Sequence, residues 1–144
     1  MSRVQLALRV SDLDASIAFY TKLFGVEPAK LRPGYANFAI AEPPLKLVLL
    51  AGEPDQETAL DHLGVEVETS EQVDQATERL ASLGLFTAVE NDTTCCYAVQ
   101  DKVWVHGPGR EPWEVYVVKE DSAAFGEDVP PTVQPEAQAA ACCK

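Results

Sequence analysis

Residues 4–25, VQLALRVSDLDASIAFYTKLFG, decide the fold. The first seven of these residues alternate in polarity and are typical of a half-buried strand. Ser11 or Asp12 then provides the N-cap of a helix predicted over residues 13–24, and Gly25 ends that helix. The chain therefore opens with a strand that is followed directly by a helix.

The same order returns in the second half of the chain. Residues 61–67 predict a strand, and Thr69 or Ser70 caps a helix that is predicted over residues 71–83 and stops at Gly84. Three β-prone runs with turn residues between them follow each helix. They are residues 29–31, 35–40 and 45–50 in the first half, and residues 86–90, 96–105 and 113–118 in the second. Each half is therefore a β-α-β-β-β module.

This order predicts the α+β class, with two βαβββ modules at about residues 3–52 and 58–120. A length of 144 residues fits one domain, which we place at residues 1–121. One helix cannot cover both faces of a module, so we expect the modules to pair around a metal-binding cleft. Residues 122–144 are rich in Ala, Pro and acidic side chains, and we expect a flexible tail there that ends in Cys142-Cys143.

Composition excludes several classes of function. The 23 Asp and Glu residues outnumber the 11 Lys and Arg residues, giving a net charge of −12 that would repel a phosphate backbone. We therefore expect no nucleic-acid partner. The longest apolar run, residues 45–52, is interrupted at Lys46 and is far shorter than the roughly 20 residues that span a bilayer. Because the N-terminus has no apolar signal segment either, we expect a cytoplasmic protein without a membrane partner.

The four cysteines form two adjacent pairs, Cys95-Cys96 and Cys142-Cys143. Neither pair has the spacing of a zinc finger. Adjacent cysteines form a disulfide with each other only in a strained ring, and a cytosolic setting keeps thiols reduced. We therefore expect vicinal thiols.

Motifs in both modules point to one family. They are residues 5–13 (QLALRVSDL), Phe19-Tyr20, residues 23–25 (LFG), His62 and residues 112–115 (PWEV). Together they resemble the vicinal oxygen chelate superfamily, which includes glyoxalase I, fosfomycin resistance proteins and type I extradiol dioxygenases. The resemblance covers about residues 3–118.

The resemblance implies metal ligands on the first and last strands of each module, at Gln5, Lys46, His62 and Glu114. Gln5 offers a carbonyl oxygen, His62 an imidazole nitrogen and Glu114 a carboxylate, whereas Lys46 has only donors and departs from the glyoxalase pattern. The remaining three-ligand face resembles the 2-His-1-carboxylate triad of non-haem iron oxygenases, with Gln5 in place of one histidine. The implied cofactor is Fe(II), with open positions for dioxygen and substrate.

Each of these residues also has a purely structural interpretation. A lone histidine in a strand is more often a satisfied core or surface residue, and Glu114 could be a solvated strand residue. His106 lies in a Gly- and Pro-containing turn at residues 105–110, so we expect it to be exposed and not to bind metal. Four aromatic side chains are expected in the core or the cleft wall: Phe38, Tyr97, Trp104 and Trp113.

Residues 91–98 (NDTTCCYA) are expected to form a polar loop that reaches over the cleft. The run TCCYA, followed by DKVWV at residues 101–105 and PWE at residues 112–114, resembles the organoarsenical-degrading and cadmium-induced branch of the superfamily, the carbon–arsenic lyases. This resemblance implies an Fe(II)- and dioxygen-dependent enzyme. It would cleave the carbon–arsenic bond of trivalent methyl or aromatic arsenicals and release arsenite.

In that interpretation Cys95 and Cys96 bind the substrate. Trivalent arsenic with one organic substituent has two remaining valences, which two thiols can satisfy. Successive strand residues face opposite ways, so the pair must lie at a bend to hold one atom. The alternative is a pair of small buried side chains on a strand.

Two other functions stay open on the same fold. A protein that sequesters a soft metal, an arsenical or a drug would protect stoichiometrically, without Fe(II) or dioxygen. A glyoxalase-like or thiol-transferase-like enzyme would use Ni, Zn or Mn, work without air, and need neither Cys95 nor Cys96. In each case the partner is a small molecule, and the sequence is compatible with a monomer or a homodimer.

Cys142 and Cys143 are either a relay site that passes the arsenical to Cys95-Cys96, or an accident of a dispensable terminus. Truncation after residue 121 separates the two interpretations. A relay predicts slower release of arsenite from a trivalent organoarsenical, whereas full turnover by the shortened chain contradicts it.

Overall fold

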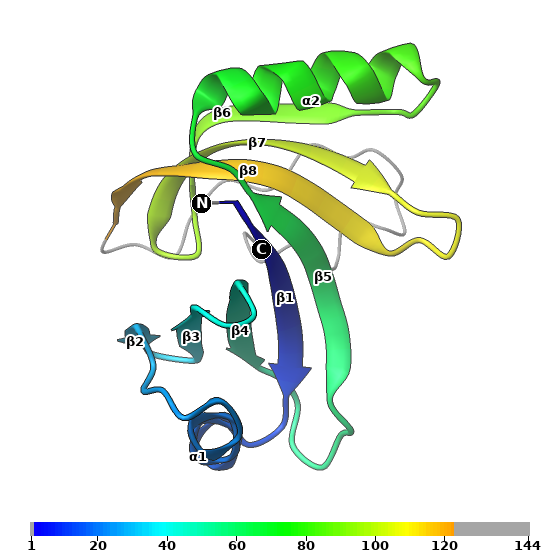
Figure 1. The fold of residues 1–144 in the computed structure, drawn as a ribbon. Helices are drawn as coiled ribbons and strands as arrows, with labels where there is room; N and C mark the ends of the chain where they lie inside the picture. Colours follow the sequence, from blue (N-terminus) through cyan, green and yellow to red (C-terminus); the bar gives the residue numbers. More distant parts are fainter. Residues whose placement is uncertain (1, 123–144) are drawn as a thin grey trace. The chain divides into compact units, whose positions relative to one another are not determined.

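The structure, a computed structural model, describes residues 2–122 (Figure 1). The described residues form β1 (Arg3–Val10), α1 (Leu13–Phe24), β2 (Lys30–Arg32), β3 (Tyr35–Ile40), β4 (Leu45–Ala51), β5 (Ala59–Glu66), α2 (Ser70–Ser82), β6 (Ala88–Cys95), β7 (Ala98–His106) and β8 (Pro112–Asp121). The predicted α+β class and the repeated β-α-β-β-β order are confirmed. The chain divides into two compact units, residues 3–61 and the residues from His62 onward. Within the described range, no helix is long and apolar enough to cross a membrane.

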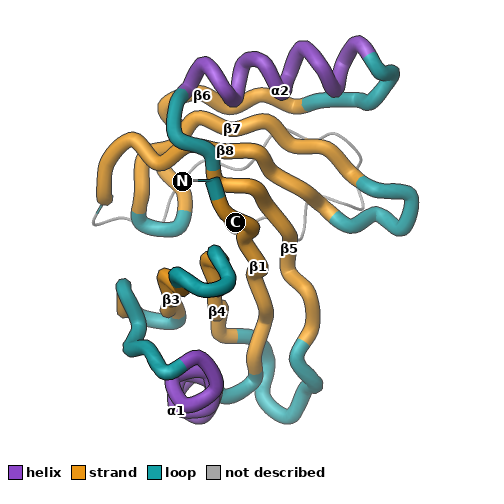
Figure 2. Tube along the Cα trace, in the orientation of Figure 1, coloured by secondary structure: helices purple, strands orange, loops and turns teal. Residues whose placement is uncertain are grey.

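The first unit has the strand order β2-β3-β4-β1. β1 lies parallel to β4, whereas β3 is antiparallel to both β2 and β4. Helix α1 packs against one face of this sheet (Figure 2). The core between them contains Val10, Ala36, Phe38, Ile40, Leu47 and Leu49, contacted by Leu13, Ile17, Tyr20 and Phe24 of the helix.

Helix α1 begins and ends where the sequence predicts. Asp12 is the N-cap, since its carboxylate accepts a hydrogen bond from the Ala15 N–H at 3.0 Å. Gly25 takes the left-handed conformation, with φ 69°, and its N–H donates to the Thr21 carbonyl. A residue with a side chain would be strained at this position.

The second unit has the strand order β5-β8-β7-β6. β5 lies parallel to β8, and β7 is antiparallel to both β8 and β6. Helix α2 starts with a capping box formed by Thr69 and Gln72. It lies along one face of the sheet (Figure 1), where Val73 and Ala76 pack against Val103 and Val117.

The opposite face of this sheet carries the polar residues. Because successive strand residues point to opposite faces, the neighbours of the valines that contact α2 point away from the helix. We call the following set the polar face: His62, Gln100, Lys102, Trp104, Glu114 and Tyr116. All six side chains are buried.

The β6–β7 connection differs from the expected loop at residues 91–98. β6 continues through Cys95 and β7 begins at Ala98, so only Cys96 and Tyr97 form the turn. Both turn residues have positive φ, 52° and 64°. Positive φ at both central residues is the signature of a type I′ hairpin turn. The expected loop is therefore a tight hairpin.

A buried carboxylate ties this hairpin to the rest of the unit. Asp101 of β7 accepts hydrogen bonds from the Ser70 hydroxyl at 2.5 Å and from the Asp92 N–H at 2.8 Å. Asp92 lies at a register shift in β6 and has φ 52°. Lys119 of β8 pairs with the Asp92 carboxylate and lies 3.5 Å from Asp101. One carboxylate thus joins the start of α2, the irregularity in β6 and strand β8.

These partners determine the protonation of Asp101. Burial by itself raises the pKa of the carboxyl, but hydrogen bonds from Ser70 and Asp92 and the charge of Lys119 hold it below its ordinary value. A carboxylate with a lowered folded-state pKa stabilises the fold above its unfolded pKa of about 4, and this stabilisation is lost as the pH falls further. The Asp101 contribution is therefore present at neutral pH and lost in acid.

We predict that Asp101→Asn lowers the free energy of unfolding at pH 7 by about 1–3 kcal/mol, because donors around the site lose a charged acceptor. The deficit should shrink as the pH is lowered from 5 towards 3. Urea melts across this range measure both effects. Asp74→Asn, at an exposed position of α2, is the control. Equal pH dependence of the Asp101 variant and the wild type would contradict the role given to Asp101.

Candidate functional site

Two of the predicted metal ligands meet on the polar face of the second unit. His62 of β5 and Glu114 of β8 lie on parallel neighbouring strands, and Gly64 is the register partner of Glu114. The His62 Nε2 and Glu114 Oε2 atoms are 2.9 Å apart. The side chains are 1% and 2% exposed, so water does not screen their interaction. Trp104 packs edge-on to the imidazole, with ring centres 5.6 Å apart.

A buried lysine completes this group. The Lys102 Nζ lies 2.8 Å from Glu114 Oε1, and the lysine side chain is fully buried. Its ammonium also lies 5.3 Å from the ring centre of Trp104 and 5.9 Å from that of Tyr116, within the range of cation–π attraction. The carboxylate of Glu114 therefore has a separate partner on each oxygen: Lys102 on one and His62 on the other.

These neighbours keep Glu114 ionised. Burial by itself raises the pKa of this carboxyl, but the charge of Lys102 and the hydrogen bond and charge of His62 bring it well below its usual range. An ionised carboxylate is the form that binds a metal. Glu114 is therefore in the metal-binding protonation state at neutral pH, with Lys102 and His62 as the present partners of its two oxygens.

Sequence reasoning missed Lys102. Alternation along β7 places Lys102 and Trp104 on the same face, and this much was available from the sequence. The strand register was not available. In the structure Trp104 pairs with Glu114 and Lys102 pairs with Tyr116, and this register brings the ammonium to the carboxylate.

Gln5 and Lys46 lie in the first unit, on β1 and β4. They are register partners on these parallel strands, and Gln5 is buried. If Gln5 corresponds to His62, the register makes Val48 the counterpart of Glu114, because Ala7 pairs with Val48 as Gly64 pairs with Glu114. The sequence predicted Lys46 as the counterpart of Glu114. The predicted strand is correct, but the counterpart on it is Val48, two residues further along. Neither Lys46 nor Val48 supplies a metal ligand.

Cys95 and Cys96 meet the geometric condition for holding one atom. Cys95 ends β6 and Cys96 is the first residue of the turn, so the required bend is present. Their Sγ atoms are 3.5 Å apart, and both residues are buried. Two sulfur ligands at about 2.3 Å from one tetrahedral atom are roughly 3.8 Å apart. The pair is therefore close to the spacing of a chelate.

The expected reduced state of this pair is not what the structure records. Cys95 and Cys96 are both disulfide-bonded, and the described residues include no free cysteine. A disulfide bond is about 2.05 Å long, so sulfurs 3.5 Å apart are not bonded to each other. Binding of an arsenical by both sulfurs requires the reduced form.

The other predicted residues are placed as follows. His106 is half-buried rather than exposed, and burial lowers the pKa of its imidazole. Phe38, Tyr97 and Trp104 are buried, and Trp113 is half-buried. Cys142 and Cys143 lie outside the described residues.

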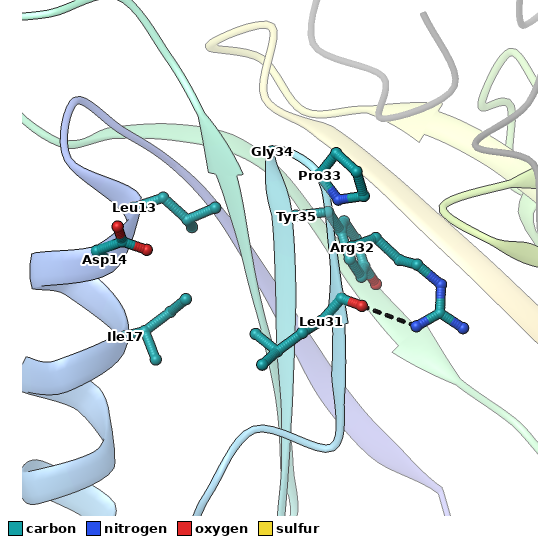
Figure 3. Close-up of a pocket in the computed structure, with 8 residues that line it drawn as sticks. All are labelled: Leu13, Asp14, Ile17, Leu31, Arg32, Pro33, Gly34 and Tyr35. Carbon is teal, nitrogen blue, oxygen red and sulfur yellow. Dashed lines mark hydrogen bonds between the residues drawn. The ribbon is translucent and has the colours of Figure 1, made fainter.

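The first unit contains a pocket that is lined by none of the predicted site residues. It has a volume of about 630 Å³ and lies between the start of α1 and the β2–β3 hairpin (Figure 3). Leu13 and Ile17 of the helix face Leu31 across it. Gln5 and Lys46 are not among the lining residues, so the pocket is not the predicted metal site.

Comparison with known proteins places this geometry in a family. The model of the Glyoxalase/Bleomycin resistance protein/Dioxygenase superfamily matches residues 3–116. The chain belongs to this superfamily. It is 66% identical over 143 residues to a trivalent organoarsenical cleaving enzyme of Thermomonospora curvata, covering 99% of this chain and 89% of that protein. It is 57% identical over 143 residues to the cadmium-induced protein CadI of Mycobacterium bovis, covering 99% and 93%.

A solved member of the superfamily has the same fold. The Mn(II)-bound glyoxalase of Novosphingobium aromaticivorans superposes with a TM-score of 0.60 at 22% identity. The match covers 89% of this chain and 43% of that chain. The predicted recognition of the vicinal oxygen chelate fold is thereby confirmed.

The residues on the polar face fit part of a superfamily metal site. His62 and Glu114 offer an imidazole nitrogen and an ionised carboxylate, two ligands suited to a divalent transition metal. Among residues 2–122, no group of three His, Cys, Asp or Glu side chains could hold a metal ion. The third ligand predicted from the sequence, Gln5, is not one of these residue types. That role stays a prediction.

We predict that Lys102→Met destabilises the metal-free protein by about 3 kcal/mol or more, because it leaves Glu114 buried without its cation. Added Mn(II) should restore much of the loss, since a bound divalent cation replaces the missing positive charge. Urea melts with and without Mn(II) measure this rescue. Lys22→Met, at an exposed position of α1, is the control. A variant as stable as the wild type without metal would contradict the pairing.

Proposed function

We propose that this protein is a non-haem Fe(II)-dependent dioxygenase that cleaves the carbon–arsenic bond of trivalent organoarsenicals and releases arsenite. The observation that carries the proposal is the pair of sulfurs 3.5 Å apart at the Cys95-Cys96 bend. The 66% identity to a protein named as a trivalent organoarsenical cleaving enzyme supports the same substrate class. The preferred substituent, methyl or aryl, is left open.

The reduced cysteine pair captures the substrate. Each sulfur forms a bond to arsenic as an arsenic–oxygen bond breaks, and the thiol proton leaves with the hydroxyl group as water. One organic substituent then stays on arsenic, since two of its three valences are taken by Cys95 and Cys96. Holding the substrate in the protein lowers the entropic cost of the later cleavage step.

The metal-binding residues in this proposal are Gln5, His62 and Glu114. Fe(II) bound there would bind and activate dioxygen, and the organic substituent would be the group that is oxidised as its bond to arsenic breaks. The chain's own contribution is to keep Glu114 ionised through Lys102 and to exclude water from around the imidazole and carboxylate. Exclusion of water strengthens the electrostatic interactions inside the site.

A second candidate function is sequestration without turnover. The cysteine turn alone favours it, because two thiols on adjacent residues of one bend, once reduced, can bind a thiophilic atom without any metal. Sequestration predicts a stoichiometric complex, and it predicts no effect of Fe(II) or dioxygen on the bound arsenical.

The deciding experiment uses reduced protein reconstituted with Fe(II) under anaerobic conditions. Trivalent methylarsenical is added with and without dioxygen, and the arsenic species are separated by chromatography. We expect arsenite over many turnovers only when both Fe(II) and dioxygen are present. Unchanged methylarsenical bound to the protein would instead support sequestration, and turnover without air would contradict the dioxygenase.

Variants separate the two halves of the proposed site. We expect Cys95→Ser or Cys96→Ser to weaken methylarsenical binding at least tenfold while iron stays bound, because one of two arsenic–sulfur bonds is lost. We expect His62→Ala or Glu114→Ala to lose iron while the arsenical still binds. Equilibrium dialysis with elemental analysis measures both ligands.

Thr94→Ser, a conservative change in the same hairpin, is the matched control for the cysteine variants. Equal iron content in the Glu114 variant and the wild type would contradict the ligand assignment. A cysteine variant that loses folding stability together with arsenical binding would favour the structural interpretation of the pair.

A further inference from the structure

Gln100, a residue of the polar face, is hydrogen-bonded to the β6–β7 hairpin that carries Cys95 and Cys96, which we call the cysteine hairpin. It lies on β7 opposite Thr93 of β6, and it is 3% exposed. Its Nε2 atom donates a hydrogen bond to the Cys95 carbonyl at 2.8 Å. The carbonyl is the backbone atom that leads directly into the turn, so this bond fixes the direction in which Cys96 leaves the strand.

The other end of the same amide is a buried acceptor. Gln100 Oε1 has no hydrogen-bond partner among the described residues. The neighbouring contact identifies which end of the amide is the oxygen, because an amide oxygen turned towards the Cys95 carbonyl would be repelled by it. Leaving a buried acceptor without a hydrogen bond lowers the stability of the fold. Such a group calls for an explanation in terms of function or an ordered water.

The position of Gln100 along β7 suggests a functional reason for its unsatisfied oxygen. Gln100 and Lys102 point to the same face of the strand, about 6.6 Å apart at two residues of strand rise. Gln100 therefore lies between the cysteine turn and the group formed by Lys102, Glu114 and His62. Gln100 is the member of the polar face that contacts the backbone of the cysteine pair directly, through the Cys95 carbonyl.

We propose that Gln100 is a positioning residue for the cysteine pair, and that its carbonyl accepts a hydrogen bond from an arsenic-bound hydroxyl group during capture. This inference rests on the proposed function. A trivalent organoarsenical enters with two hydroxyl groups, and the first cysteine displaces one of them as water. The second hydroxyl remains until the other sulfur–arsenic bond forms, and Gln100 Oε1 orients it in that interval.

Gln100→Met tests both roles, because methionine has a similar length but neither donates nor accepts strong hydrogen bonds. Two probes separate the roles: trivalent methylarsenical, which enters with hydroxyl groups, and Cd²⁺, which takes two thiolates and brings no arsenic-bound hydroxyl. Affinities are measured on reduced, full-length protein by equilibrium dialysis. Thr93→Val is the matched control, since it removes a hydroxyl group from the register partner of Gln100 on β6.

For Gln100→Met we expect an affinity for methylarsenical about tenfold or more below that of the wild type, and a smaller loss for Cd²⁺. Iron content should be unchanged. In turnover, KM for the arsenical should rise more than kcat falls. Thr93→Val should stay within about twofold of the wild type for both probes.

Other outcomes overturn the inference in distinct ways. Equal losses for Cd²⁺ and methylarsenical would contradict the acceptor role and leave positioning alone. Wild-type affinity for both probes would contradict both roles. A parallel loss of iron and folding stability would make Gln100 a structural residue. Wild-type protein that binds Cd²⁺ but no arsenical would contradict the proposed function and the acceptor role, while the Cd²⁺ result still decides positioning.

Discussion

A carboxylate that stays charged inside the protein is the constraint on which the second unit depends. Removing Glu114 from water costs several kcal/mol, and only close partners of opposite charge or good hydrogen bonds offset that cost. Lys102 and His62 provide them from the two strands on either side. The arrangement requires β5, β8 and β7 to keep one register, and the apolar packing of α2 on the other face holds that sheet together.

The sequence was sufficient for the fold wherever the signal was local. Helix α1 was predicted at residues 13–24 because Asp12 and Gly25 mark its ends by their own chemistry. The site was predicted less completely. The ion pair of Lys102 depends on a strand register that no short motif specifies. The Cys96-Tyr97 turn was missed because such turns are normally recognised by glycine or asparagine, and neither is present.

The two modules share an order of elements but not a chemistry. The strand register places Val48 in the first unit where Glu114 stands in the second. The second unit thus carries the group formed by His62, Lys102 and Glu114, the cysteine hairpin and Gln100 on its four adjoining strands. On its polar face, two alternate residues of β7 connect the two proposed ligand sites. Gln100 contacts the cysteine hairpin, and Lys102 contacts Glu114.

The turn at Cys96 and Tyr97 sets folding stability against the proposed capture of a ligand. A residue other than glycine in the left-handed region costs about 1–3 kcal/mol, and this turn has two in succession. An Asn-Gly sequence would relieve that cost and make a firmer hairpin. It would also remove one of the two sulfurs. A search for more heat-resistant variants would therefore favour changes at this turn that remove the adjacent cysteine pair, and thermostability alone would be a misleading guide to the proposed function.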